Sequence, residues 1–248
     1  MDPASRTASA AVAARSSGPL TFGADWCSFA GVQGGLLVGE LLDAAGAAPR
    51  SVTAHLLRPV APGVPVHVTA APDRSGRTGS VRTTLAQGGR TAAVAQVLTS
   101  AAPQAAGPRE AVGEPADGAP FALPRELVPV ADHLEIRALG RGRPLGGGSE
   151  ARLVAWVRVL GASTPFTALG VLVDALPPSL FAVWTAPRPL PTVELTAHLA
   201  GPAPEPGAWV RIDQRTSWAD DEYCVDDAEL HAADGTLLTR ARQTRRMV

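Results

Sequence analysis

The chain contains no lysine and only two cysteines, Cys27 and Cys224, and aromatic residues make up 4% of its 248 residues. Two distant cysteines do not make a disulfide framework. No apolar run approaches the roughly 18 to 20 residues that a membrane-spanning helix needs. Acidic and basic residues nearly balance, giving a formal net charge of −1, so the strongly basic surface of a nucleic-acid binder is excluded. The sequence predicts a protein that binds neither nucleic acid nor membranes.

Hydrophobic residues make up 46% of the chain, enough for a substantial core. Residues 1–18 are rich in Ala and Ser, contain Arg6 and Arg15, and lack the unbroken apolar segment of a signal peptide. They predict a flexible leader and a cytoplasmic location. Residues 101–121 are rich in Ala, Pro, Gly and Glu and predict a linker. The expected domains are therefore residues 19–100 and 122–248.

The second half of the chain repeats the first. Three segments recur in the same order, and the offset between partners grows along the chain as small loop insertions would make it. A duplicated domain is therefore expected. The matched segments are Val38–Ala45 with Leu169–Leu176, Thr53–Leu56 with Thr196–Leu199, and Gly88–Gln96 with Gly235–Gln243.

Each half predicts one helix followed by a meander of alternating strands, which is an α+β arrangement. The helices are expected from about Gly34 to Ala45 and from about Thr167 to Leu176, where apolar residues recur at three- and four-residue spacing. Turn signals separate the strands that follow. The expected strands are residues 52–57, 64–71, 80–85 and 92–99 in the first half, and 134–139, 152–159, 193–199, 209–217, 224–231 and 237–244 in the second.

Several short motifs resemble a known family. Gly31–Gly35 at the helix start, Leu57–Pro59 at a strand end, Leu134–Arg137, and Asp234 through Gln243 are similar to the type II acyl-CoA thioesterases, which carry two fused hotdog domains. The resemblance implies a double hotdog fold with two antiparallel sheets, each wrapping a central helix. We expect the two sheets to join side by side in one extended layer.

The resemblance also implies a site. The catalytic Asp, Thr and Gln of the family correspond to Asp174 on the second helix, Thr192 at the start of the next strand, and Gln243 on the last strand. The family usually has an Asp-His pair just after the Thr, and this chain has Glu194 and Leu195 there. The implied reaction is hydrolysis of an acyl-CoA or acyl-carrier thioester, with no cofactor and no metal.

These residue types suit that reaction. Thioester hydrolysis needs a positioned water, a base and donors for the developing oxyanion. Asp174 lies among apolar residues, and its burial would raise its pKa toward that of a useful base. On an alternating strand, Gln243 shares the face of Ala241 and predicts an inward amide. The alternatives are a solvent-facing Asp174, a Thr192 bonded to local backbone, and a surface Gln243.

Two further groups are candidates for substrate binding. Gly34 and Gly35 open the first helix, where free N–H groups could hold the thioester carbonyl; the alternative is tight packing. Arg58 and the arginines near the C-terminus could meet the phosphates of coenzyme A, or could form a solvated strand face.

Other functions remain open from the sequence. Hydration or dehydration of an acyl thioester is one alternative, although a hotdog hydratase would have a His soon after the helix Asp, and Pro177 and Pro178 follow here. A non-catalytic acyl-binding protein is another, and a homo-oligomer is compatible with any of them.

The repeat predicts that the two halves are not equivalent. It places Asp43 opposite Asp174, Gln96 opposite Gln243, and Pro49 opposite Thr192. Because proline has neither a hydroxyl nor an N–H group, we expect one active site, in the second half.

Overall fold

The computed structural model describes residues 15–16, 18–46, 48–100 and 107–248. Most of the expected leader, at residues 1–14 and 17, therefore lies outside the described residues. At its end, Arg15–Ser16 form the short strand β1, which pairs with Thr69 and Ala70.

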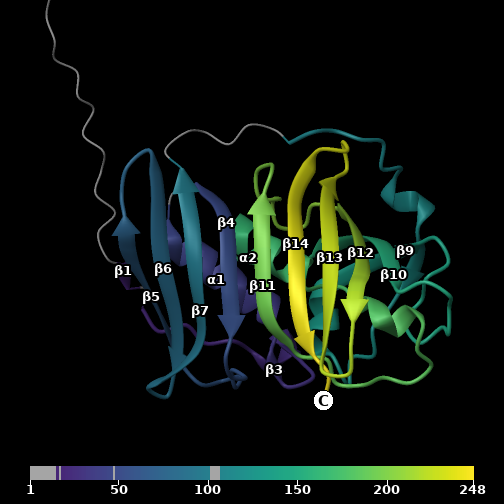
Figure 1. The fold of residues 1–248 in the computed structure, drawn as a ribbon, viewed down its shortest axis with the longest axis horizontal. Coiled ribbons are helices and arrows are strands. Elements are labelled where there is room, and N and C mark those ends of the chain that lie inside the picture. The colour runs from purple at the N-terminus through teal and green to yellow at the C-terminus, as the bar shows by residue number, and fades with distance from the viewer. Residues whose placement is uncertain (1–14, 17, 47, 101–106) are drawn as a thin grey trace, which may run out of the picture.

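The main feature is one antiparallel sheet of twelve strands, in the order β1-β5-β6-β7-β4-β11-β14-β13-β12-β10-β9-β8 (Figure 1). A two-stranded sheet of β2 and β3 lies apart from it. The strands of the first half are β2 Cys27–Ser28, β3 Gly31–Val32, β4 Pro49–Leu56, β5 Val66–Arg74, β6 Thr78–Gln87 and β7 Arg90–Ser100. Those of the second are β8 Ala119–Phe121, β9 Leu134–Leu139, β10 Arg152–Val159, β11 Thr192–Leu199, β12 Val210–Ala219, β13 Tyr223–Ala232 and β14 Leu237–Arg246.

The sheets of the two halves join side by side in one continuous layer, as expected. The halves join where β4 pairs with β11, from His55 opposite Glu194 to Ser51 opposite His198. Without this pairing, β4 and β11 would each leave an edge of unpaired N–H and C=O groups. Pairing the two strands gives these backbone groups hydrogen-bond partners in both halves.

The expected strands are all present, and their ends differ by a few residues. The short strands β1, β2, β3 and β8 were not expected. Of these, β8 lies within residues 101–121 and pairs with Ile136, Arg137 and Ala138 of β9. Residues 101–106 of the expected linker lie outside the described part. A three-residue strand is too short for alternation of apolar and polar residues to reveal it.

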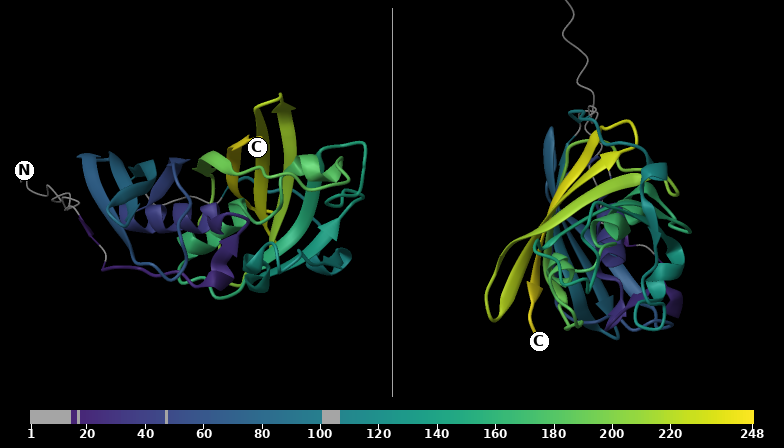
Figure 2. Two further views of the ribbon diagram at one scale, coloured as in Figure 1. Left: turned by 90° about the horizontal axis from the view of Figure 1, so that it is seen from below. Right: turned by 90° about the vertical axis from the view of Figure 1, so that its right-hand side faces the viewer.

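Two helices lie on the same face of the sheet, side by side (Figure 2). Helix α1 spans Gly34–Ala45, as expected, and α2 spans Pro165–Val173. Thr164 caps α2 by a reciprocal pair of hydrogen bonds with Thr167. The described residues also form four short 3-10 helices: η1 Ala24–Trp26, η2 Pro115–Asp117, η3 Pro129–His133 and η4 Ser179–Ala182.

Helix α2 ends three residues earlier than expected, so Asp174 follows the helix and is not inside it. Its backbone has left the helical region, with φ −113° and ψ 20°. Two prolines, Pro177 and Pro178, follow after Ala175 and Leu176, and a proline cannot continue a helix. The side chain of Gln33, the N-cap residue of α1, donates to the carbonyl oxygens of Val171 (3.4 Å) and Asp174 (2.9 Å) at the end of α2.

Glycines allow the two helices to touch through their backbones. A Cβ atom on Gly170 would lie 2.3 Å from the carbonyl oxygen of Gly35, and one on Gly39 would lie 2.6 Å from the Cα of Thr167. The start of α1 therefore meets the end of α2, and the helices run antiparallel. This contact brings Asp174 to the N-terminus of α1.

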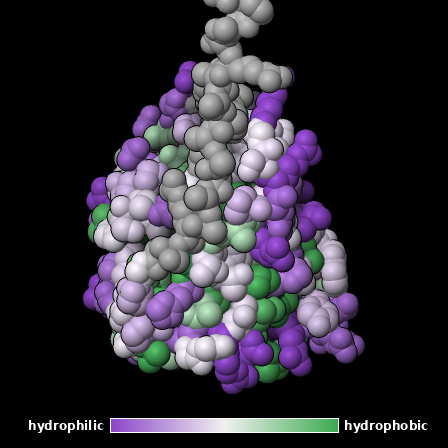
Figure 3. All heavy atoms as spheres, turned by 90° about the vertical axis from the view of Figure 1, so that its left-hand side faces the viewer, coloured by the Kyte–Doolittle hydropathy of each residue, from purple (hydrophilic) through white to green (hydrophobic). Residues whose placement is uncertain are grey.

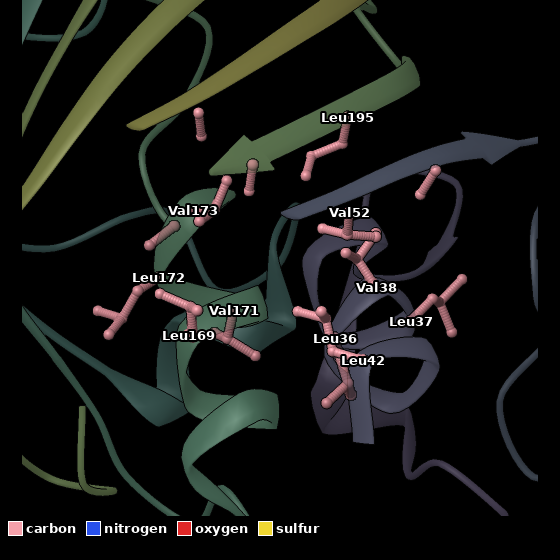
Figure 4. Packing of buried hydrophobic residues seen from close by; sticks show 14 of the residues in the cluster. Leu36, Leu37, Val38, Leu42, Val52, Leu169, Val171, Leu172, Val173 and Leu195 are labelled. Carbon is pink, nitrogen blue, oxygen red and sulfur yellow. The ribbon is translucent and has the colours of Figure 1, made fainter. Parts of the chain in front are cut away.

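The core lies between the helices and the sheet, and both halves contribute to it. Figure 4 shows Leu36, Val38 and Val52 of the first half beside Leu169 and Leu195 of the second. Residues alternate between buried and exposed along strands such as β5, so the opposite face of the sheet is more polar. At the end of the molecule where β1 and β5 lie, the surface outside the grey atoms mixes hydrophilic and hydrophobic side chains (Figure 3).

Candidate active site

Asp174 lies at the junction of the two helices. Its Oδ2 accepts a hydrogen bond from the backbone N–H of Gly35, 3.1 Å away. A carboxylate is favourable there, because a helix start offers free N–H groups and the positive end of the helix dipole. The side chain of Asp174 is 12% exposed. It is therefore mostly buried.

Thr192 and Gln243 meet beside Asp174. The Thr192 hydroxyl donates to Oε1 of Gln243 over 2.9 Å, and Nε2 of Gln243 donates to the carbonyl oxygen of Val173 over 2.8 Å. Thr192 begins β11, and Gln243 lies on the neighbouring strand β14 and is 1% exposed. Since Val173 directly precedes Asp174, the three residues expected from the sequence converge on the end of α2.

Two charged residues, Arg245 and Asp226, complete this cluster, and neither was expected in it from the sequence. From the sequence, Arg245 was expected among the arginines that could meet phosphates. Its side chain instead points inward: Nε donates to Oδ2 of Asp226 (2.9 Å), Nη1 donates to Oγ1 of Thr192 (3.0 Å), and Nη2 lies 3.5 Å from Oδ1 of Asp174. The signal was available for Arg245, because alternation places it on the face of Gln243.

Burial dominates the electrostatics of the site. It raises the pKa of the Asp174 carboxyl, and this effect outweighs the Arg245 charge and the Gly35 N–H, both of which lower that pKa. Burial also raises the pKa of the Cys224 thiol to about 11, so Cys224 is a neutral neighbour of Asp226 and Arg245 at physiological pH. The chemistry available here is a desolvated carboxylate next to a hydroxyl and an amide.

Of the residues expected to bind substrate, Gly34 and Gly35 lie beside Asp174, and Arg58 makes its hydrogen bond within the first half. Gly34 and Gly35 open α1 beside Asp174, and both of the alternatives weighed for them are present at Gly35: its N–H points into the site, and its Cα packs against Gly170. Because that N–H already serves Asp174, Gly34 is the better candidate donor for a thioester carbonyl. Arg58 is exposed, and its Nη1 donates to the carbonyl oxygen of Thr91, 2.5 Å away, in the first half.

The first half does not reproduce the constellation. Ala54 pairs with Ala95 as Ala197 pairs with Ala241, so the counterpart of Gln243 is Val97. The expected match of Gln96 to Gln243 is therefore wrong by one residue, and a shift of one residue reverses the face. Gln96 lies on the exposed face, where its Nε2 donates to Asp73 and Ser80.

The same register confirms the match between Pro49 and Thr192. Pro49 pairs with Thr99 as Thr192 pairs with Arg245. The first half thus has Pro49, Val97 and Thr99 at the positions of the second-half hydroxyl, amide and guanidinium. Its counterpart of Asp174, Asp43, lies within α1 and not beyond its end.

A cavity of about 350 Å³ lies elsewhere, against β8 and β9, and its lining includes Phe121, Ile136 and Trp209. None of the cluster residues borders it, so the chemistry and this cavity are separate. Within the described ranges, no group of three or more His, Cys, Asp and Glu side chains could hold a metal ion. Over the same residues, no helix is long and apolar enough to cross a membrane.

Solved structures share this fold. A protein of unknown function with a hotdog fold from Alicyclobacillus acidocaldarius matches with a TM-score of 0.80 and 23% identity, covering 93% of this chain and 92% of that one. A protein proposed to be a thioesterase II from Thermobifida fusca matches with a TM-score of 0.78 and 23% identity, over 93% and 91%. A TesB protein from Mycobacterium avium subspecies paratuberculosis gives 0.67 and 19%, over 88% and 87%. These matches define a hotdog protein.

The family follows from the sequence models. The model of the acyl-CoA thioesterase N-terminal domain matches residues 22–100, and that of the C-terminal domain matches residues 103–247. None of the curated proteins matches this sequence. The chain belongs to the acyl-CoA thioesterase family and is a thioester hydrolase.

Proposed function

We propose that the chain hydrolyses acyl-CoA thioesters at the cluster of Asp174, Thr192 and Gln243. The observation that carries the proposal is the convergence of a buried carboxylate, a hydroxyl and an amide at the N-terminus of α1. These are the groups that can take a proton from water and orient it. No cofactor is needed for this chemistry.

The reaction would begin with a water molecule held between Asp174 and the Thr192–Gln243 pair. Asp174 takes a proton from the water while the water oxygen attacks the thioester carbonyl carbon. The Gly34 N–H is the candidate donor to the developing oxyanion. The C–S bond then breaks, and the proton passes from Asp174 to the departing thiolate. The products are a carboxylic acid and free coenzyme A.

The carrier of the acyl group is a second part of the proposal. Coenzyme A is favoured by the family, and an acyl carrier protein would present the same phosphopantetheine thioester. Arg58 is exposed beyond the end of β4, and we assign it to the phosphate groups that both carriers share. An assembly of several copies would not change the chemistry, because the proposed residues all come from one chain.

The test is thiol release from short, medium, long and aromatic acyl-CoA substrates, compared with one acyl-carrier thioester. Asp174→Asn should lower kcat/KM by about a hundred- to ten-thousand-fold, as expected for loss of a general base. Asp43→Asn is the matched control, because it changes the equivalent carboxyl of the other half, where the partner groups are missing. Full activity in Asp174→Asn, or equal losses in the two folded variants, would contradict the proposed site.

A further inference from the structure

Arg245 is a buried guanidinium with an unusual set of neighbours. It is 4% exposed although it lies near the C-terminus among other arginines. Its Nε and Nη1 make the hydrogen bonds to Asp226 and Thr192 described above, while Nη2 has no hydrogen-bond partner within the described part of the chain. That nitrogen lies 3.5 Å from Oδ1 of Asp174, within reach of an ion pair.

Resting on the proposed function, we propose that Arg245 is a positioning residue: anchored by Asp226, it directs the Thr192 hydroxyl toward Gln243 and keeps a positive charge beside Asp174. Asp226 is 1% exposed, and its Oδ1 also accepts a hydrogen bond from Thr216 over 2.7 Å. The anchor is therefore itself held in place. A planar guanidinium can bond two groups in fixed directions at once, which an ammonium cannot do.

The first role concerns the direction of one proton. Because Nη1 of Arg245 donates to Oγ1 of Thr192, the hydroxyl hydrogen must point elsewhere, and Gln243 Oε1 is its acceptor. The oxygen of Thr192 thus keeps a lone pair for a water molecule. Without Arg245, the hydroxyl could rotate and the water would lose a fixed acceptor.

The second role concerns the charge of the base. A general base must be a carboxylate, and burial disfavours that form of Asp174. Among the groups that lower its pKa, the Arg245 charge has the largest effect, followed by the Gly35 N–H of α1. Asp226 of β13 has the opposite effect. Strand β11 contributes only the neutral Thr192, so Arg245 is the cation that favours the ionised base.

These relations predict pH shifts of opposite sign. The acid limb of kcat/KM rises with pH as Asp174 loses its proton. In Arg245→Met the carboxyl loses its cation, its pKa rises, and the limb should move to higher pH by about one unit or more. In Asp226→Asn a nearby negative charge is removed, while the amide oxygen can still accept from Nε. The pKa of Asp174 falls, and the limb should move to lower pH.

The control is Arg242→Met. Arg242 lies on the same strand and is exposed on the opposite face, where it pairs with Asp227 over 2.6 Å. The Arg242→Met substitution should leave the acid limb of kcat/KM at the pH of the wild type. Arg245→Lys keeps the positive charge and loses the planar guanidinium that bonds two groups at once. We therefore expect its acid limb to lie near that of the wild type while kcat stays reduced. A purely structural role for Arg245 would lower the rate in both variants without moving the limb.

A carbon-13 NMR titration of the Asp174 carboxyl, with the signal assigned by comparison with Asp174→Asn, measures the pKa of Asp174 without turnover. If the wild type releases no thiol from any substrate but the Asp174 titration shifts in the two directions expected, the proposed function fails and the electrostatic role of Arg245 stands. If the wild type is active and neither the titration nor the limb moves, the inference is overturned. Should Arg245→Met not fold, Arg245→Lys and Asp226→Asn give the same decision, since a limb unmoved in Asp226→Asn contradicts the inference.

Discussion

At the scale of single residues, the neutral amide of Gln243 limits the number of buried negative charges in the cluster. Its Oε1 accepts from Thr192 and its Nε2 donates to Val173, so both ends of the amide are used. Asp174 and Asp226 already place two carboxyls against one guanidinium. A glutamate at this position would add a third buried negative charge, which costs several kcal/mol unless it is paired. A neutral amide avoids that cost and still orients the hydroxyl.

The Thr192 hydroxyl is expected to matter for rate more than for stability. Thr192→Val keeps the shape and removes the oxygen that links Arg245 to Gln243, so kcat/KM should fall by about ten- to a hundredfold. Thr192→Ser keeps the hydroxyl and should retain most of the activity. The measurement is initial-rate kinetics on the best acyl-CoA substrate, with circular dichroism to confirm folding.

Thr196→Val is the matched control on the same strand. The Thr196 hydroxyl bonds Glu194 and Thr53 on the exposed side of the sheet, away from Asp174. Its loss should leave the rate within about twofold of the wild type, because surface substitutions change little. A similar loss of rate in Thr192→Val and Thr196→Val would mean that the threonine hydroxyl has no specific role.

The sequence could predict part of this cluster and not the rest. Alternation along the last strand places Gln243 inward, and the structure confirms it. The same alternation places Arg245 inward, but an arginine is almost never buried without a partner. That partner, Asp226, lies on β13, and its position opposite the last strand depends on register. Pairing register between strands cannot be read from one strand alone, which is also why Gln96 was matched to the wrong residue.

At the scale of elements, the end of α2 and the start of α1 form the framework of the site. The apolar periodicity predicted both helices, and the bounds of α1 agree with the structure. It could not locate the end of α2, because Ala175 and Leu176 remain apolar and buried although the helix has ended at Val173. The carbonyls at that end are bonded by Gln33, which is distant in sequence. A helix end set by a tertiary contact leaves little local signal.

The close contact between the helices predicts a steric requirement for glycine. In Gly170→Ala the new Cβ would lie 2.3 Å from the Gly35 oxygen and 2.6 Å from the Gly39 nitrogen, both backbone atoms that cannot rotate away. The helices would have to separate, so the free energy of unfolding should fall by about 3 kcal/mol, the upper part of the usual range for overpacking. Urea denaturation measures this loss, and activity should fall with it because Gly35 positions Asp174.

Gly18→Ala provides the comparison, since a Cβ at Gly18 would have no atom within 4 Å. Its unfolding free energy should stay within about 0.5 kcal/mol of the wild type, or rise slightly from the loss of freedom in the unfolded chain. Wild-type stability in Gly170→Ala would show that the helices can separate without cost.

At the scale of the whole molecule, the two halves share one sheet and one pair of packed helices. Duplication in the sequence predicted two units of similar architecture, and the expectation that their sheets join was correct. The identity of the joining strands follows from long-range pairing between β4 and β11. The proposed active site needs this joining, because Gly35 comes from the first half and Asp174, Thr192 and Gln243 come from the second.

This shared architecture predicts that both halves unfold together. Thr53 lies in the middle of β4, between Gln96 of β7 and Thr196 of β11. In Thr53→Pro the strand loses one ladder hydrogen bond and gains a ring that central strands rarely accept, at a cost of about 3 kcal/mol or more. Because Thr53 is exposed, Thr53→Ala separates the backbone effect from the loss of a side chain.

Thermal unfolding is followed by circular dichroism, which reports both halves, and by tryptophan fluorescence, to which the second half contributes Trp156, Trp184, Trp209 and Trp218. The two signals should coincide in the wild type and fall together to a lower Tm in Thr53→Pro, with Thr53→Ala close to the wild type. A fluorescence transition that keeps its wild-type Tm while part of the circular dichroism signal is lost earlier would mean that the halves are independent units, and that β4–β11 pairing does not couple them.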